Sequence, residues 1–127
     1  MPDWLSDEWL DRLAAAVAER PPAPGVTGVV ETVIAIGRGK DVRIRVAYKE
    51  GEPSWSPSGD AADVTFTVPT AEAQAVLTGD LEPSVGFMRG RIKTSGSPGL
   101  VLAWLQSTST PAWAAWRDSV KAFTDLP

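Results

Sequence analysis

Apolar side chains recur at helical spacing in the first part of the chain. Between residues 6 and 19, SDEWLDRLAAAVAE, they return every three or four positions from Trp9 to Val17, which places them on one side of a helix. Ser6 is a suitable N-cap, and the prolines of residues 21–25, PPAPG, cannot continue a helix. The pattern therefore predicts an amphipathic helix over residues 6–19, followed by a short connection.

Beyond this connection, apolar side chains alternate with polar ones, which is typical of half-buried strands. Residues 29–36, VVETVIAI, are rich in β-branched side chains, and residues 37–41, GRGKD, have the composition of a hairpin turn. The clearest alternation lies in residues 41–51, where apolar positions alternate with basic ones. Residues 52–57 form a shorter segment flanked by prolines, as an edge strand would be. We predict an antiparallel meander of three strands.

The second half of the chain begins with one further alternating segment, residues 63–68 or DVTFTV, with Val64, Phe66 and Val68 directed inward. Proline and glycine positions divide the rest into short elements. These are helices over residues 70–79, from Pro83, from Pro98 and from Pro111, and a strand over residues 91–95. Strands with polar outer faces need helices on only one side, so this order predicts a two-layer α+β domain.

The length and the missing residue types limit the possible functions. A chain of 127 residues corresponds to one domain, which we assign to residues 1–127. The sequence contains no cysteine and no histidine, so structural zinc sites, cysteine nucleophiles and Ser-His-Asp triads are excluded. Since histidine is also the commonest general acid and base, we expect no enzyme, no metal and no cofactor.

The charge disfavours nucleic-acid binding, because a net charge of −4 is the opposite of the basic surface that such domains present. Basic residues do cluster between residues 38 and 49 and between residues 89 and 93. The solvated face of a sheet explains them, and an anion-binding site is the alternative. No run approaches the roughly 20 apolar residues of a membrane span, and the N-terminus lacks a signal-peptide pattern. We therefore expect a soluble cytoplasmic protein.

A longer pattern covers residues 63–96, DVTFTVPTAEAQAVLTGDLEPSVGFMRGRIKTSG. An alternating strand and a helix are followed by a Gly-acid-Leu turn, a proline, a small helix ending in an aromatic residue, a Gly-basic-Ile-basic strand and a glycine. This segment resembles the sterol carrier protein type 2 family, and residues 110–120, TPAWAAWRDSV, are similar to the ending of bacterial single-domain members. The chain departs from the family directly after this segment, at Ser97, where an acidic residue is frequent. The matching positions are Gly79, Asp80, Leu81, Pro83, Phe87, Gly90, Arg91, Ile92, Lys93 and Gly96.

The resemblance implies a lipid-binding domain. Members of the family fold as a five-stranded, mostly antiparallel sheet with helices covering one face. This fold surrounds an apolar tunnel that accepts sterols, fatty acids, fatty acyl-CoAs or phospholipids, and the family supplies no catalytic residue. The implied function of this chain is therefore binding and carrying or sequestering an apolar lipid. The chain is acidic and has no basic amphipathic helix, so we expect at most transient contact with a membrane.

The candidate ligand-binding residues follow from the expected tunnel. A helix of under two turns lies between Pro83 and Gly90, and we expect it to hold Phe87 and Met88 above the inward side chains of the strands. All candidates are equally suited to a packed core, because periodicity does not distinguish a packed interior from a hollow one. The predicted lining residues are Ile34, Ile44, Val46, Phe66, Leu77, Phe87, Met88, Leu102, Trp104 and Trp113.

The tryptophans leave a second question open. All except Trp55 lie in the terminal segments, and Trp113 and Trp116 share one side of the predicted C-terminal helix. This helix either docks onto the core or serves as a hinged lid or an interfacial foot on a membrane. If the interior is packed, the alternative function is a non-catalytic accessory domain that forms a homodimer through its exposed sheet face or its tryptophan-bearing end.

Overall fold

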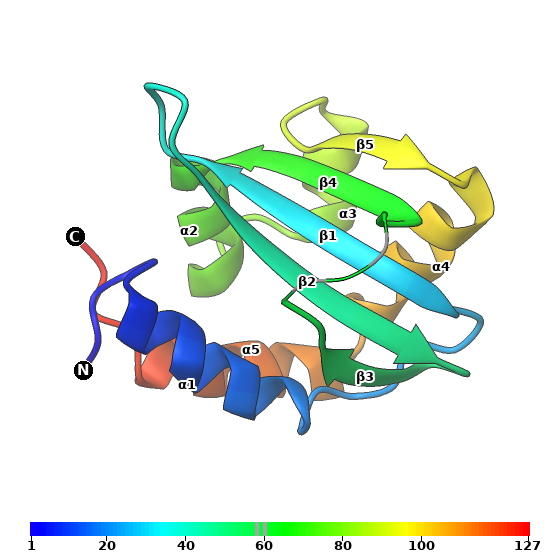
Figure 1. Cartoon of the computed structure of the whole chain (residues 1–127), viewed down its shortest axis with the longest axis horizontal. Coiled ribbons are helices and arrows are strands. Elements are labelled where there is room, and N and C mark those ends of the chain that lie inside the picture. Colours follow the sequence, from blue (N-terminus) through cyan, green and yellow to red (C-terminus); the bar gives the residue numbers. More distant parts are fainter. Residues whose placement is uncertain (58, 60) are drawn as a thin grey trace.

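The computed structural model of the chain describes residues 1–57, 59 and 61–127, and its elements follow the predicted order (Figure 1). The helices are α1 (Asp7–Val17), α2 (Thr70–Thr78), α3 (Pro83–Met88), α4 (Pro98–Ser107) and α5 (Pro111–Ala122). The strands are β1 (Gly28–Ala35), β2 (Asp41–Lys49), β3 (Glu52–Trp55), β4 (Val64–Pro69) and β5 (Lys93–Gly96). The predicted α+β class and element order are therefore confirmed.

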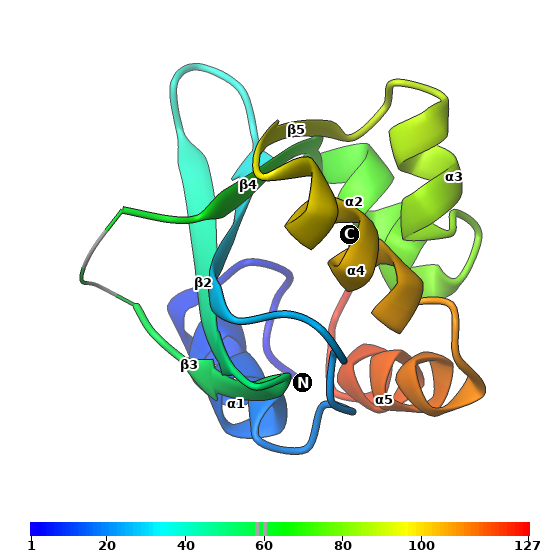
Figure 2. The same cartoon turned by 90° about the vertical axis from the view of Figure 1, so that its right-hand side faces the viewer.

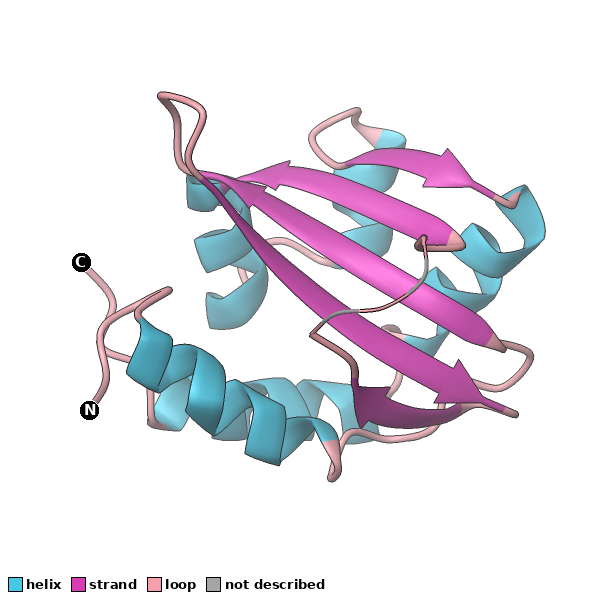
Figure 3. Ribbon diagram, in the orientation of Figure 1, coloured by secondary structure: helices cyan, strands magenta, loops and turns pink. Residues whose placement is uncertain are grey.

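The strands form one five-stranded sheet in the order β3-β2-β1-β4-β5 (Figure 3). β1 pairs antiparallel with β2, which pairs antiparallel with β3, so the predicted meander is confirmed. β4 lies on the other side of β1 and runs parallel to it, with Val30 opposite Val64, and β5 is antiparallel to β4. This single parallel pairing places β1 in the middle of a mostly antiparallel sheet.

The helices cover one face of this sheet. When the molecule is turned, α2, α3, α4 and α5 lie on the same side of the strands (Figure 2). α1 contacts β3 at the edge of the sheet, and α2 contacts α5. Two layers are sufficient because alternation gives each strand one apolar face, and only that face has to be removed from water.

Local signals in the sequence determine where helices begin and end. At the start of α1, the Ser6 hydroxyl accepts a hydrogen bond from the backbone N–H of Trp9 at 3.2 Å, as expected of an N-cap. Gly79 follows α2 with a φ of 86°, a left-handed conformation that glycine adopts without steric cost. These positions agree with the boundaries predicted from the sequence to within two residues.

The last strand begins later than predicted. β5 starts at Lys93 and not at residue 91, because the backbone N–H groups of Arg91 and Ile92 donate to the carbonyl of Gly86 at 2.8 and 3.1 Å. These bonds wrap the chain around the end of α3 before it pairs with β4. The predicted strand is therefore correct in kind and shifted along the chain.

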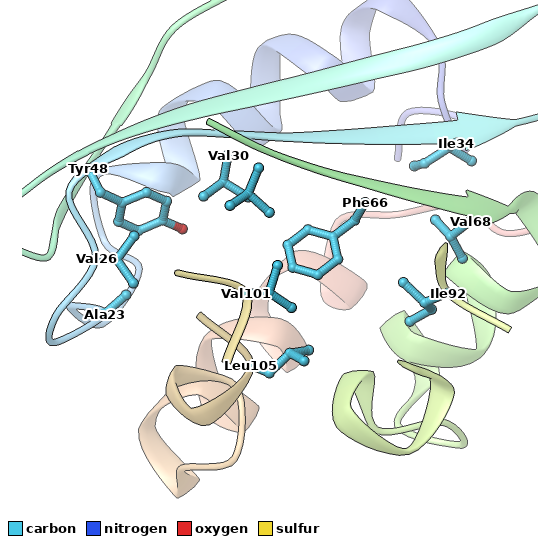
Figure 4. Packing of buried hydrophobic residues seen from close by; sticks show 11 residues of the cluster. Ala23, Val26, Val30, Ile34, Tyr48, Phe66, Val68, Ile92, Val101 and Leu105 are labelled. Atoms are coloured by element: carbon cyan, nitrogen blue, oxygen red, sulfur yellow. The ribbon is translucent and has the colours of Figure 1, made fainter. Parts of the chain in front are cut away.

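Apolar side chains between the two layers form two core clusters. One cluster lies under β1 and β4 and includes Phe66 and Val68, which are buried as their alternation predicts (Figure 4). The other joins α1, α2 and α5 and includes Trp9, Leu77 and Val120. The two clusters share the partly buried neighbours Ile44 and Val46 of β2, which therefore lie between them.

Candidate functional site

The interior between the sheet and the helices is hollow. A cavity of about 200 Å³ adjoins both core clusters, and almost all the side chains in its wall are apolar, as in many ligand pockets. The wall residues outside the sheet lie on the helices or, in three cases, in the segments that precede or connect the elements. They are Trp4, Trp9, Leu13, Val17, Arg20, Ala73, Val76, Leu77, Pro83, Ile92, Trp104, Leu105, Trp113, Trp116, Arg117 and Val120.

The strands supply the rest of the wall, because every second side chain of a strand faces the helices. Ile44 and Val46 of β2 point inward and yet remain partly accessible, since the cavity leaves part of their surface uncovered. The sheet residues in the wall are Val30, Thr32 and Ile34 of β1, Ile44, Val46 and Tyr48 of β2, and Phe66 and Val68 of β4.

The C-terminal helix is docked against the domain and also forms part of the cavity wall. Trp113 is buried, and the indole N–H of Trp116 donates to the backbone carbonyl of Ala16 at 2.8 Å, which connects α5 to α1. Both tryptophans and Val120 face the cavity from one side of the helix. Of the arrangements predicted for the C-terminal helix, the structure therefore has the one in which the helix docks onto the core.

Every tryptophan except Trp55 lies in the cavity wall. The indole N–H of Trp4 donates to the Thr70 hydroxyl at 2.9 Å, and that of Trp9 donates to the Thr124 hydroxyl at 2.7 Å. These bonds hold the rings in one orientation and leave their carbon faces for apolar contact. The arrangement places several intrinsic fluorophores around one space.

The cavity wall contains a buried cation. Arg20 follows α1, lies in the wall and is only 5% exposed. Its guanidinium donates to the carbonyl of Pro21 at 2.6 Å and to the hydroxyl of Ser107 at 2.8 Å. Its Cζ also lies 5.4 and 5.7 Å from the ring centroids of Tyr48 and Trp104. The indole N–H of Trp104 donates to the Tyr48 hydroxyl at 3.1 Å, so these groups form one connected cluster.

Burial shifts the pKa of both ionisable groups in this cluster. It lowers the pKa of Arg20, against a smaller opposing effect of Tyr48, but an arginine remains cationic because its ordinary pKa is so high. Burial raises the pKa of Tyr48, and the charge of Arg20 and the hydrogen bond from Trp104 partly oppose this rise. At neutral pH this part of the cavity wall therefore carries a positive charge beside a neutral hydroxyl.

Most of the residues predicted to line the site meet in this cavity. They come from distant parts of the chain, and strand alternation together with helical spacing brings them to one place. Whether they contact a ligand stays a prediction. The predicted residues in the wall are Ile34, Ile44, Val46, Phe66, Leu77, Trp104 and Trp113.

Phe87, Met88 and Leu102 do not line the cavity, contrary to the prediction. Met88 ends α3 and is 83% exposed, because Phe87, one position earlier, packs partly buried on the core and the helix turns Met88 away from it. Leu102 is 55% exposed because Val101 and Leu105 occupy the buried side of α4. The short helix therefore borders the core and leaves its last side chain in solvent.

Several wall residues were not among the predicted ones. Helical spacing marks Trp9 and Val17 as buried, but the same spacing suits a solid core. Tyr48 lies on the inward face of β2, so its alternation was the available signal. No pattern in the sequence indicates Arg20, because it lies between the end of α1 and the proline-rich connection.

Two kinds of feature are absent from the described part of the chain. In residues 1–57, 59 and 61–127, no three or more His, Cys, Asp or Glu side chains form a group that could hold a metal ion. None of the helices in those residues has the length and apolar character needed to cross a membrane.

Comparison with known sequences identifies one family. The model of the SCP-2 sterol transfer family matches residues 8–106. Proteins named sterol carrier protein 2 from Bos taurus and Homo sapiens are each 34% identical to this chain over 65 residues. That match covers 50% of this chain and 12% of each relative, so the chain corresponds to a small part of those proteins.

Comparison with solved structures identifies the same fold. A conserved hypothetical protein from Thermus thermophilus, described as possibly a sterol carrier protein, has a TM-score of 0.69 at 19% identity, covering 92% of this chain and 89% of that one. A crystal structure of sterol carrier protein 2 has a TM-score of 0.66 at 18% identity, covering 89% and 96%. The palmitated form of a sterol carrier protein 2-like protein from Aedes aegypti has a TM-score of 0.62 at 22% identity, covering 84% and 96%.

Proposed function

Because this chain belongs to the SCP-2 sterol transfer family, we propose that it binds an apolar lipid in the cavity between sheet and helices and carries or sequesters it. The observation that carries the proposal is the cavity, whose wall is almost wholly apolar. The palmitated state of the similar Aedes aegypti protein supports the same class of ligand. The proposal gives the cavity a binding role and no catalytic step.

An empty cavity is costly for a domain of this size. At about 24 cal/mol per Å³, an unfilled space of about 200 Å³ destabilises the fold by about 5 kcal/mol. Whole domains are stable by only about 5–15 kcal/mol. Transfer of an acyl chain from water into the space gains about 0.8 kcal/mol for each buried CH₂ group. A bound lipid therefore offsets the destabilisation that the empty cavity causes.

Tryptophan fluorescence tests the proposal directly, because all the tryptophans except Trp55 surround the cavity. Delipidated protein is titrated with cholesterol, oleate and oleoyl-CoA. We expect a saturable change near one ligand per protein for at least one of them, and the Trp55→Phe variant should respond in the same way. If no lipid gives a saturable change and native mass spectrometry detects no bound species, the proposed function is wrong.

A second candidate function is that of an accessory domain that pairs with another copy. The observation that favours it is that α2, α3, α4 and α5 lie on one side of the sheet, so that none of these four helices covers its other face (Figure 2). Sedimentation over a range of protein concentrations separates the two candidates. Concentration-dependent self-association together with no response to lipid favours the accessory domain.

A further inference from the structure

Arg20 differs from the other arginines of the chain in its environment. It is 5% exposed, and arginine is rarely so buried without a paired acid, because its charge has to leave water. In the described part of the chain, the ion pairs involve Arg43, Arg45, Arg91 and Arg117, and none involves Arg20. The buried charge of Arg20 therefore has no counter-charge among those residues.

The groups around Arg20 are neutral. Its guanidinium donates to the Pro21 carbonyl and the Ser107 hydroxyl, and it lies over the rings of Tyr48 and Trp104. Those two hydrogen bonds use two of the five N–H donors of a guanidinium. The surroundings hold the side chain in place without neutralising it, and donors remain for another acceptor.

The cavity wall is positively charged overall. Among the described residues, it includes Arg20 and Arg117 and neither Asp nor Glu. Arg117 is paired with Asp118 at 3.1 Å, so its charge is partly compensated. Charges interact strongly where water is excluded, and an anionic group attached to an apolar chain is therefore the best complement to this space.

We propose that Arg20 is the residue that selects the head group of the ligand, by binding the carboxylate of a long-chain fatty acid in preference to the neutral head group of another lipid, an inference that depends on the proposed function. The planar guanidinium suits the two oxygens of a carboxylate. The Tyr48 hydroxyl already accepts a bond from Trp104 and points toward the interior (Figure 4), so it has its own proton to donate to the same group. A carboxylate is favoured over the phosphates of an acyl-CoA, because a guanidinium so deeply buried leaves little room beside it for a nucleotide.

Isothermal titration calorimetry with lipids of one chain length tests this assignment, because it gives the dissociation constant of each lipid. Oleate, oleyl alcohol and oleoyl-CoA are compared on the wild type, on Arg20→Met and on Arg12→Met, which removes an exposed arginine outside the cavity wall. We expect the wild type and Arg12→Met to bind oleate at least tenfold more tightly than oleyl alcohol. Arg20→Met should lose this preference by binding oleate at least tenfold more weakly and oleyl alcohol unchanged.

A measurement on the wild type keeps the test decisive if Arg20→Met fails to fold. With oleate labelled with ¹³C at the carboxyl, NMR follows the titration of the bound head group. A carboxylate beside Arg20 should have a pKa below that of unbound oleate, whereas a carboxyl in a purely apolar wall would have a raised pKa.

The outcomes separate this inference from the proposed function. Equal binding of oleate and oleyl alcohol, or a raised pKa of the bound carboxyl, overturns the role of Arg20 and leaves lipid binding in place. Tighter binding of oleoyl-CoA than of oleate overturns the fatty-acid assignment and identifies phosphate as the anion. If neither oleate nor oleyl alcohol nor oleoyl-CoA binds, and cholesterol does not bind either, both proposals fail.

Discussion

Gly96 and Gly37 adopt related backbone conformations, with φ of 114° and 100°, in very different surroundings. A Cβ at Gly96, the last residue of β5, would collide with the backbone carbonyl of Asp63 on the neighbouring chain segment. A Cβ at Gly37, in the turn between β1 and β2, would meet no atom within 4 Å. Backbone strain is common to both positions, and the collision is specific to Gly96.

We therefore expect Gly96→Ala to lower the free energy of unfolding by more than about 3 kcal/mol and Gly37→Ala to lower it by about 1–2 kcal/mol. Urea unfolding followed by tryptophan fluorescence measures both. Similar losses in the two variants would mean that strain alone, and not close approach of the strands, requires a glycine at position 96.

Tyr48 gives the stability a predictable dependence on pH. Burial raises the pKa of its hydroxyl in the folded state, so the folded protein holds this proton more tightly than the unfolded chain does. Its contribution is complete below the pKa of about 10 in the unfolded chain and is lost as pH rises through the folded-state pKa.

We expect the free energy of unfolding to fall more steeply above about pH 10 in the wild type than in Tyr48→Phe. Urea unfolding at a series of alkaline pH values gives the two slopes. Loss of the hydroxyl also removes the acceptor for Trp104, but that cost does not depend on pH. Equal slopes in the two proteins would contradict a raised pKa for Tyr48.

At the scale of elements, two helices differ in how they are capped. At the start of α5, the Thr110 hydroxyl accepts a hydrogen bond from the backbone N–H of Trp113 at 3.1 Å. At the start of α4, Ser97 occupies the N-cap position, but its side chain makes no capping hydrogen bond. The two positions allow a hydroxyl side chain that caps its helix to be compared with one that does not.

Thr110→Ala should lower the free energy of unfolding by about 1 kcal/mol, because it leaves a helix N–H without its acceptor. Ser97→Ala should change it by less than about 0.5 kcal/mol. Thermal and urea unfolding of both variants provide the check. An equal loss in both would show that the Thr110 side chain is not acting as a cap.

The elements were largely predictable because their signals are local. Alternation identifies β2 and β4, and prolines begin α3, α4 and α5. The pattern does not show that β4 lies parallel beside β1, because pairing depends on contacts between distant segments. Which side of a helix faces the core also depends on tertiary packing, so the sequence predicts Met88 and Leu102 in the interior although both are exposed.

At the scale of the whole molecule, a cavity and a solid core require the same inward apolar residues. Ile44 and Phe66 were therefore predicted at the centre of the interior, while the hollow itself was expected only from the family resemblance. The sequence does not indicate Arg20, because its burial results from packing against Tyr48 and Trp104, which are distant in the chain. The polar cluster in the cavity wall is visible only in three dimensions.

Ligand binding should stabilise the whole domain. Because the lipid binds the folded state and fills its cavity, a ligand at 100 times its dissociation constant adds about 2.7 kcal/mol to the free energy of unfolding. We expect oleate to raise the Tm of delipidated protein by several degrees in calorimetry. An unchanged Tm at saturating, non-micellar oleate would contradict binding to the native state.

The most direct test of a hollow, lipid-binding interior is a cavity-filling substitution on α2. Ala73 lies in the cavity wall, whereas Ala71 on the same helix is exposed, so Ala73→Leu and Ala71→Leu form a matched pair. The measurement is the free energy of unfolding of each delipidated variant, together with its affinity for oleate. A hollow interior predicts that Ala73→Leu keeps or gains stability and binds oleate at least tenfold more weakly, while Ala71→Leu binds as the wild type does. If Ala73→Leu instead loses about 1–3 kcal/mol, as in an overpacked core, and binds oleate as the wild type does, the interior is solid.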